Sequence, residues 1–176
     1  DDSISAYKWL LAKDIEPNNI IIGGESAGGG LTMATLLKLK DLKLPLPKVA
    51  VMMSPWVDLT TSGKSLETNY KYEPEIAEGV KQMAILYAGE KSTKNPLISP
   101  VFADLGGLPP LLIQAGGIEA LLEDSILLAE RAKSAGVQVT LEVYEKMTHV
   151  FQVFGDLLSE SKKAFDNIKK FIESLP

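Results

Sequence analysis

The amino-acid sequence predicts an α/β fold, with a mainly parallel sheet and helices on both of its faces. Short apolar runs alternate with longer segments of helical character along all 176 residues, which is the order of strands joined by right-handed helical crossovers. No repeat, low-complexity segment or flexible linker marks a second domain. A glycine-rich turn, IIIGGESAGGG at residues 20–30, follows the first apolar run.

Each element is predicted from apolar spacing and from the turn residues around it. We expect helices over residues 3–13, 27–41, 74–88, 121–135 and 157–175. We expect strands over residues 19–24, 48–53, 110–116 and 137–145. The first strand and the start of the helix after it are apolar enough to predict burial, and Gly136 predicts the end of the fourth helix.

Composition excludes several classes of function. The chain has no cysteine and one histidine, so disulfides, thiolate sites and His-cluster metal sites are ruled out, and we expect no metal or cofactor. The net charge is -5 and no basic block interleaves with aromatic residues, so we expect no nucleic-acid partner. No apolar run reaches the roughly 20 residues of a membrane span. A cytoplasmic location is favoured, although the sequence leaves the compartment open.

Three functions compete for the glycine turn. A phosphate loop needs lysine where this chain has Gly29, and no three glycines have the G-x-G-x-x-G spacing of a dinucleotide site. Residues 24–28, GESAG, instead match G-x-S-x-G between a strand and a helix, the pattern that displays a nucleophilic serine, Ser26. The two glycines of this motif are expected to be small because larger side chains would collide across the turn. Ala27 would then offer its backbone N–H to an oxyanion.

A serine nucleophile needs a general base and a carboxylate that orients the base. The base candidate is His149, which follows the fourth strand at the sheet edge where α/β folds bind ligands. Topology alone does not choose among four acids: Asp58, Glu119, Glu123 and Asp124. Glu119, in the loop before a helix, is favoured. Asp124 and its neighbour Glu123 fall within that helix and are expected to point outward or pair locally.

These motifs resemble the hormone-sensitive-lipase-like branch of the α/β-hydrolases, also called bacterial family IV esterases. The matching segments, in order, are GGESAGGGL, SPWVDLT, NPLISPVFADLGGLPPLLIQAGG and LLEDSILLAERAKSAGVQVTLEVYEKMTHVFQ. The resemblance implies Ser26 as nucleophile, His149 as base and Glu119 as the third member, with Asp58 as a scaffold residue. Most of the family has Asp-Pro-Leu where this chain has Glu119-Ala120-Leu121, so a longer side chain must be accommodated there.

The resemblance also implies a segment that this chain does not contain. The family carries an H-G-G-G motif upstream of the serine that supplies further oxyanion donors, and the 25 residues before Ser26 lack it. We therefore expect residues 1–176 to be the carboxyl-terminal part of a single α/β-hydrolase domain that lacks the N-terminal strands and cap. Ile20, Ile21 and Ile22 would then form an open apolar edge, so we expect an N-terminal segment in this polypeptide or in a companion chain.

The expected activity is hydrolysis of small-molecule esters with short or medium acyl chains, through an acyl-enzyme on a Ser-His-Glu triad. The alternative is a non-catalytic α/β-hydrolase-fold protein that binds a small ligand. The sequence is also compatible with a homodimer.

Overall fold

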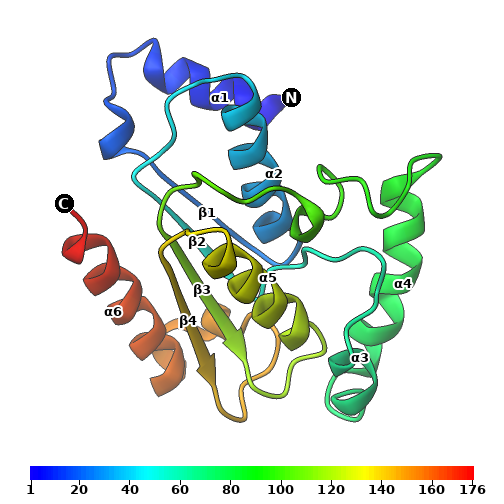
Figure 1. The fold of residues 1–176 in the computed structure, drawn as a ribbon. Coiled ribbons are helices and arrows are strands. Elements are labelled where there is room, and N and C mark those ends of the chain that lie inside the picture. The colour runs from blue at the N-terminus through cyan, green and yellow to red at the C-terminus, as the bar shows by residue number, and fades with distance from the viewer.

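Four parallel strands form a single sheet in a computed structural model that describes all of residues 1–176 (Figure 1). Their order in the sheet, β1-β2-β3-β4, is also their order along the chain. The strands are β1 (Ile21–Glu25), β2 (Val49–Met53), β3 (Leu111–Gly116) and β4 (Val139–Tyr144). Because every pairing is parallel, all four carboxyl ends lie at one edge of the sheet, while β1 and β4 form its two sides.

The helices confirm the predicted alternation, with boundaries within two residues of those expected. They are α1 (Asp2–Leu11), α2 (Ala27–Asp41), α4 (Pro74–Ala88), α5 (Leu122–Ser134) and α6 (Ser159–Ser174). The short α3 (Ser65–Thr68) and the 3-10 turns Pro17–Asn19, Pro100–Phe102 and Phe151–Leu157 were not predicted. Gly136 has φ 80° after α5, as expected of a glycine that ends a helix. None of the helices has the length and apolar character needed to span a bilayer.

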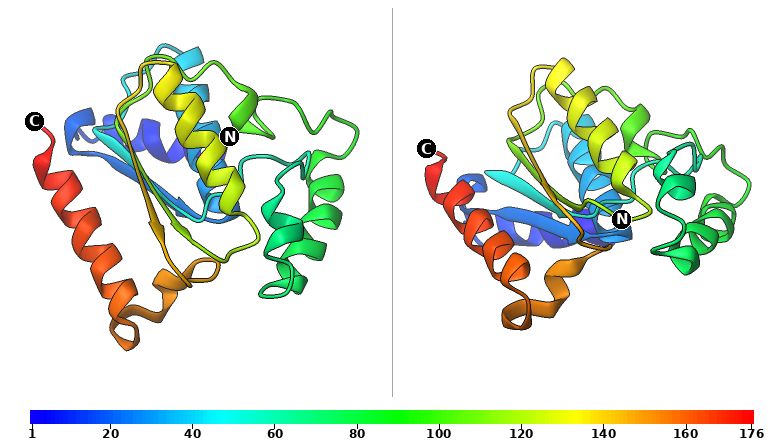
Figure 2. Two further views of the ribbon diagram at one scale, coloured as in Figure 1. Left: turned by 60° about the horizontal axis from the view of Figure 1, so that its bottom comes forward. Right: turned by 90° about the horizontal axis from the view of Figure 1, so that it is seen from below.

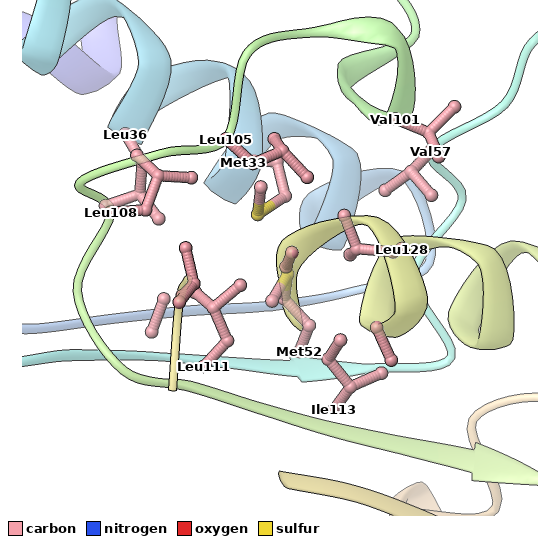
Figure 3. Close-up of a cluster of buried hydrophobic side chains, with 14 residues drawn as sticks. Met33, Leu36, Met52, Val57, Val101, Leu105, Leu108, Leu111, Ile113 and Leu128 are labelled. Atoms are coloured by element: carbon pink, nitrogen blue, oxygen red, sulfur yellow. The ribbon is translucent and has the colours of Figure 1, made fainter. Parts of the chain in front are cut away.

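The main core lies between the sheet and two helices, α2 and α5 (Figure 3). Met33 and Leu128 from these helices pack with Met52 of β2 and Ile113 of β3. Successive strand residues point to opposite faces, and Gln114 accordingly donates from Nε2 to the Ala164 carbonyl of α6 at 2.9 Å. Helices therefore cover both faces, with α6 opposite α2 and α5 (Figure 2).

The open side of β1 is less apolar than the sequence suggested. Ile20 is buried at 5% exposure among α1 and α2 residues, whereas Ile21 is 45% exposed. The prediction that the start of α2 is buried holds for Gly29 and Met33 but not for Ala27, which is exposed, or for Leu31, which is 52% exposed. No strand pairs with β1 on its free side.

Helices α3 and α4 stand beside the sheet and pack on the loop after β3 (Figures 1 and 2). The contact is a second apolar cluster in which Leu66, Ala77 and Val80 meet Ala120 and Leu121. The last turn of α4 leaves three large side chains largely exposed: Ile85, Leu86 and Tyr87. The α3–α4 segment is thus attached to the sheet through the loop that carries Glu119.

Candidate active site

Ser26 occupies a strained turn between β1 and α2. Its backbone has φ 51° and ψ −120°, a region that costs a non-glycine residue about 1–3 kcal/mol. The turn is fixed from β2, because the Ser26 N–H donates to the Met53 carbonyl at 3.0 Å and the Trp56 N–H donates to the Ser26 carbonyl at 2.9 Å. A strained serine held at the carboxyl end of a strand is the geometry of a displayed nucleophile.

Of the two glycines in the G-x-S-x-G motif, Gly24 and Gly28, only Gly24 is required for steric reasons. A Cβ on Gly24 would lie 2.3 Å from the Gly28 carbonyl oxygen, so this position admits no side chain. A Cβ on Gly28 would meet nothing within 4 Å, so the prediction that Gly28 must also be small is wrong for this structure.

Ala27 is the first residue of α2. Its N–H therefore has no acceptor inside the helix, and it lies at the positive end of the helix dipole. An apolar pocket of about 240 Å³ opens beside it and is lined by α2, by Trp56 and Leu59 of the loop after β2, and by Tyr87 of α4. The first turn of α2 thus combines a free donor with an apolar surface.

Glu119 lies in the loop after β3 and is fully buried. Its Oε2 accepts from the Ser54 hydroxyl at 2.6 Å and from the Gly116 N–H at 2.8 Å, whereas its Oε1 has no partner. Burial raises the pKa of this carboxyl to about 8, and the two hydrogen bonds oppose that rise. One oxygen of Glu119 is therefore anchored and the other is free to orient a base.

His149 lies in the loop after β4, next to the loop of Glu119. Burial lowers its pKa to about 4, so the imidazole is neutral at pH 7 and able to accept a proton. Its Nδ1 is buried without a hydrogen-bond partner. The unpaired Nδ1 of His149 and the unpaired Oε1 of Glu119 are complementary groups on adjacent loops.

Backbone contacts hold these two loops against each other. The Gly117 N–H donates to the Tyr144 carbonyl at 2.7 Å, and the Ile118 N–H donates to the Met147 carbonyl at 3.1 Å. A Cβ on Gly116 would lie 2.3 Å from the Met147 carbonyl oxygen, so the approach depends on glycine. The loop after β3 (residues 117–121, the acid loop) and the loop after β4 (residues 145–150, the histidine loop) therefore form one packed unit at the carboxyl edge of the sheet.

The three predicted residues share this edge, but no hydrogen bond or ion pair joins the side chains of Ser26, His149 and Glu119 in this structure. A working triad requires the imidazole to come within hydrogen-bonding distance of both partners.

The other two acids serve a different loop. Asp58 accepts from the Thr60 N–H and hydroxyl and from the Ser62 hydroxyl, so its oxygens are committed to its own turn. Asp124 is 4% exposed and accepts from the Val57 and Asp58 N–H groups at 2.9 and 2.8 Å. The prediction that Asp124 points outward or pairs locally is wrong, because it fastens α5 to the loop after β2. Glu123 likewise reaches another segment, accepting from the N–H groups of Lys64 and Ser65.

Two residues that the sequence did not single out connect the loops of the acid and the base. Ser54 donates to Glu119 and accepts from the Val150 N–H at 3.0 Å, and it has φ 48° directly after β2. Glu73 accepts from the N–H groups of Ala120 and His149. In the sequence, the only feature that could have pointed to Ser54 is its position at the end of a strand. For Glu73 it is the position directly before Pro74.

Comparison with known proteins identifies the fold family. A family model described as the alpha/beta hydrolase fold matches residues 1–153. The chain is 37% identical to an acetyl-hydrolase of Streptomyces hygroscopicus and 37% identical to an esterase of Acinetobacter venetianus, covering 99% of this chain and 58% of each relative.

A solved structure shows the same likeness. The crystal structure of an esterase from the bacterial hormone-sensitive lipase family superposes with a TM-score of 0.94 at 47% identity, covering 98% of this chain and 58% of that one. The chain thus spans a little under three fifths of the length of these relatives. From the matched model, the shared fold and the strained serine turn together, we conclude that the chain belongs to the α/β-hydrolase fold family and resembles its hormone-sensitive lipase branch.

Proposed function

We propose that the chain carries the catalytic residues of a serine carboxylesterase that hydrolyses short- to medium-chain acyl esters. Ser26 is the nucleophile, His149 the general base, and Glu119 the acid that orients the imidazole. The observation that carries the proposal is the strained Ser26 turn, at the same edge as the unpaired Nδ1 of His149 and the unpaired Oε1 of Glu119. The esterase and acetyl-hydrolase relatives support the same class of reaction.

The reaction proceeds in two halves. His149 takes the hydroxyl proton as the Ser26 oxygen attacks the ester carbonyl, and the Ala27 N–H donates to the oxyanion. His149 then protonates the leaving alcohol, which leaves an acyl group on Ser26. A water molecule deprotonated by His149 attacks this acyl group, and the carboxylic acid is released as His149 returns the proton to the Ser26 oxygen. Glu119 stabilises the imidazolium in both halves.

Ala27 offers a single oxyanion donor. We propose that residues 1–176 form the carboxyl-terminal part of one α/β-hydrolase domain, completed by an N-terminal segment of the same polypeptide or by a companion chain. The free side of β1 and the share of the relatives that the chain spans support this proposal. That segment would supply the other oxyanion donors.

The test is hydrolysis of p-nitrophenyl butyrate by the complete polypeptide that contains this chain. The Ser26→Ala variant is expected to lose about 10⁴-fold or more in kcat, as removal of a triad nucleophile does. Retained turnover in Ser26→Ala would contradict the assignment.

The alternative is a non-catalytic fold that binds a small ligand, which the lack of a hydrogen bond between the three side chains favours. A serine-directed phosphonate separates the two functions by mass spectrometry. An esterase is labelled once, at Ser26, whereas a binding protein with an inactive serine stays unlabelled.

A further inference from the structure

We propose that Glu73 is a positioning residue for the proposed reaction, which fixes the backbone of His149 relative to the end of the acid loop. The inference rests on the proposed function, because a positioning role needs a reaction to serve. Its Oε2 accepts from the Ala120 N–H at 2.7 Å, and its Oε1 accepts from the His149 N–H at 2.5 Å. One carboxylate thus holds the backbone of the base and the backbone directly after the acid.

A carboxylate is required for this double contact. Glu73 is 7% exposed, and no cation pairs with it among the ion pairs of the molecule. Burying an unpaired charge is costly unless hydrogen bonds compensate it. Two N–H donors provide that compensation, and they need two acceptor oxygens. Glutamine has the same length but one oxygen, so its amide group would meet an N–H donor at the second contact.

The backbone around Glu73 is itself fixed. Glu73 precedes Pro74, the first residue of α4, and has φ −144° and ψ 59°, because a residue before proline avoids the helical region. Its carbonyl accepts the N–H of Ala77 at 3.1 Å in the first turn of the helix. The side chain therefore projects from a rigid helix start.

Glu73 is the last member of a polar row with four-residue spacing. The Ser65 hydroxyl donates to the Ala120 carbonyl at 2.7 Å, and Asn69 Nδ2 donates to the Glu119 carbonyl at 2.9 Å. These two contacts reach the acid loop alone. Glu73 adds the single contact from this row to the histidine loop. Asn69 is therefore a suitable comparison for Glu73, because both side chains bind the acid loop but only Glu73 also binds the backbone of His149.

Ser54 makes a parallel connection from the end of β2. It joins the Glu119 side chain to the Val150 N–H, whereas Glu73 joins Ala120 to His149. The two loops are therefore bridged at two consecutive positions, once from the sheet and once from α4. Glu73 is the bridge through which movement of the α3–α4 segment would reach the base.

The experiment compares three variants of the complete polypeptide with p-nitrophenyl butyrate: Glu73→Gln, Asn69→Ala and Glu75→Gln. Glu75 is the matched control, since it is an exposed glutamate on the same helix. Misplacing a catalytic group by about 1 Å costs on the order of 100-fold in rate. We therefore expect kcat of Glu73→Gln to fall about 10- to 100-fold with KM within about twofold, while Asn69→Ala loses less and Glu75→Gln matches the wild type.

Titration with the phosphonate counts the competent serines, so kcat is expressed per labelled site. A merely structural role would lower the number of sites and leave kcat per site unchanged, and that result would overturn the proposal. So would a Glu73→Gln variant no slower than Asn69→Ala. An unlabelled, inactive wild type would instead overturn the proposed function, and this inference with it.

A second measurement does not depend on the folding of a variant. Hydrogen exchange of the His149 and Ala120 amides in the unmodified protein reports the two contacts directly. Protection of both amides, comparable with that of the strand amides, is expected. Rapid exchange of the His149 amide would show that the link is not made in solution and would overturn the proposal.

Discussion

At the scale of single residues, two buried polar atoms of the site have no hydrogen-bond partner. An unsatisfied buried polar atom costs about 1–3 kcal/mol, and Glu119 Oε1 and His149 Nδ1 are both in this state. A hydrogen bond between them would remove both penalties. Its formation would also place the imidazolium charge of the reaction beside the carboxyl, which lowers the pKa of Glu119 below its resting value.

The acid is tested by comparing Glu119→Gln with Asp58→Asn, two buried carboxylates changed to their amides. Loss of the triad acid leaves the wrong imidazole tautomer, at a cost of about 10³–10⁴-fold in kcat, so we expect this loss for Glu119→Gln. Asp58→Asn disturbs hydrogen bonds within its own turn and should lower the melting temperature with kcat within about tenfold. The reverse ranking would assign the acid to Asp58.

The pKa of Glu119 also predicts how stability changes with pH. Between its ordinary value near 4.5 and about 8, the folded state holds a proton that the unfolded chain has released, so stability falls as pH rises. His149 acts in the opposite sense between about 4 and 6.5, and Asp124 acts in the same sense as Glu119 up to about 7.

Between pH 7 and 8 Glu119 is expected to contribute most of the change in stability, with a smaller contribution of the same sign from Asp124. We expect the free energy of unfolding of this chain to drop by about 1 kcal/mol across that window, and to change less in Glu119→Gln. Urea denaturation at the two pH values measures the difference. If the free energy of unfolding changes by the same amount between pH 7 and 8 in the wild type and in Glu119→Gln, then the folded protein does not hold a proton on Glu119.

At the scale of elements, the sequence predicted what depends on local pattern. The turn at Ser26, the loops of Glu119 and His149 and every long helix follow from apolar spacing and glycine placement. Ser54 and Glu73 could not be predicted, because each acts through partners 65 to 96 residues away or 47 to 76 residues away. The burial of Asp124 was missed for the same reason, since its partners lie in the loop after β2.

The turn before α2 gives a sharp pair of variants. Gly24→Ala would force a Cβ against the Gly28 carbonyl, a backbone atom that cannot move aside, so we expect loss of both activity and folding stability. Gly28→Ala meets open space inside a helix, where alanine is favoured by about 1 kcal/mol. Thermal denaturation of the complete polypeptide compares the two, and a destabilised Gly28→Ala would show that another segment fills that space.

At the scale of the whole molecule, the sheet has a free strand on each side, and apolar side chains lie near one of them. Ile21 of β1 is 45% exposed, and an open apolar strand edge is a template for association. We therefore expect the isolated chain to self-associate in light scattering. Co-expression with the amino-terminal part of the esterase that is 47% identical should reduce association, if that part pairs with β1.

The edge itself is tested by Ile21→Lys against Leu42→Lys. The two side chains are 45% and 42% exposed, so both changes remove similar apolar surface, but only Ile21 lies on the free strand. A lysine on an edge strand opposes pairing with another chain, so Ile21→Lys should lower the scattering mass more than Leu42→Lys does. If the isolated chain is active and monodisperse, β1 needs no partner, and the proposed N-terminal completion is refuted.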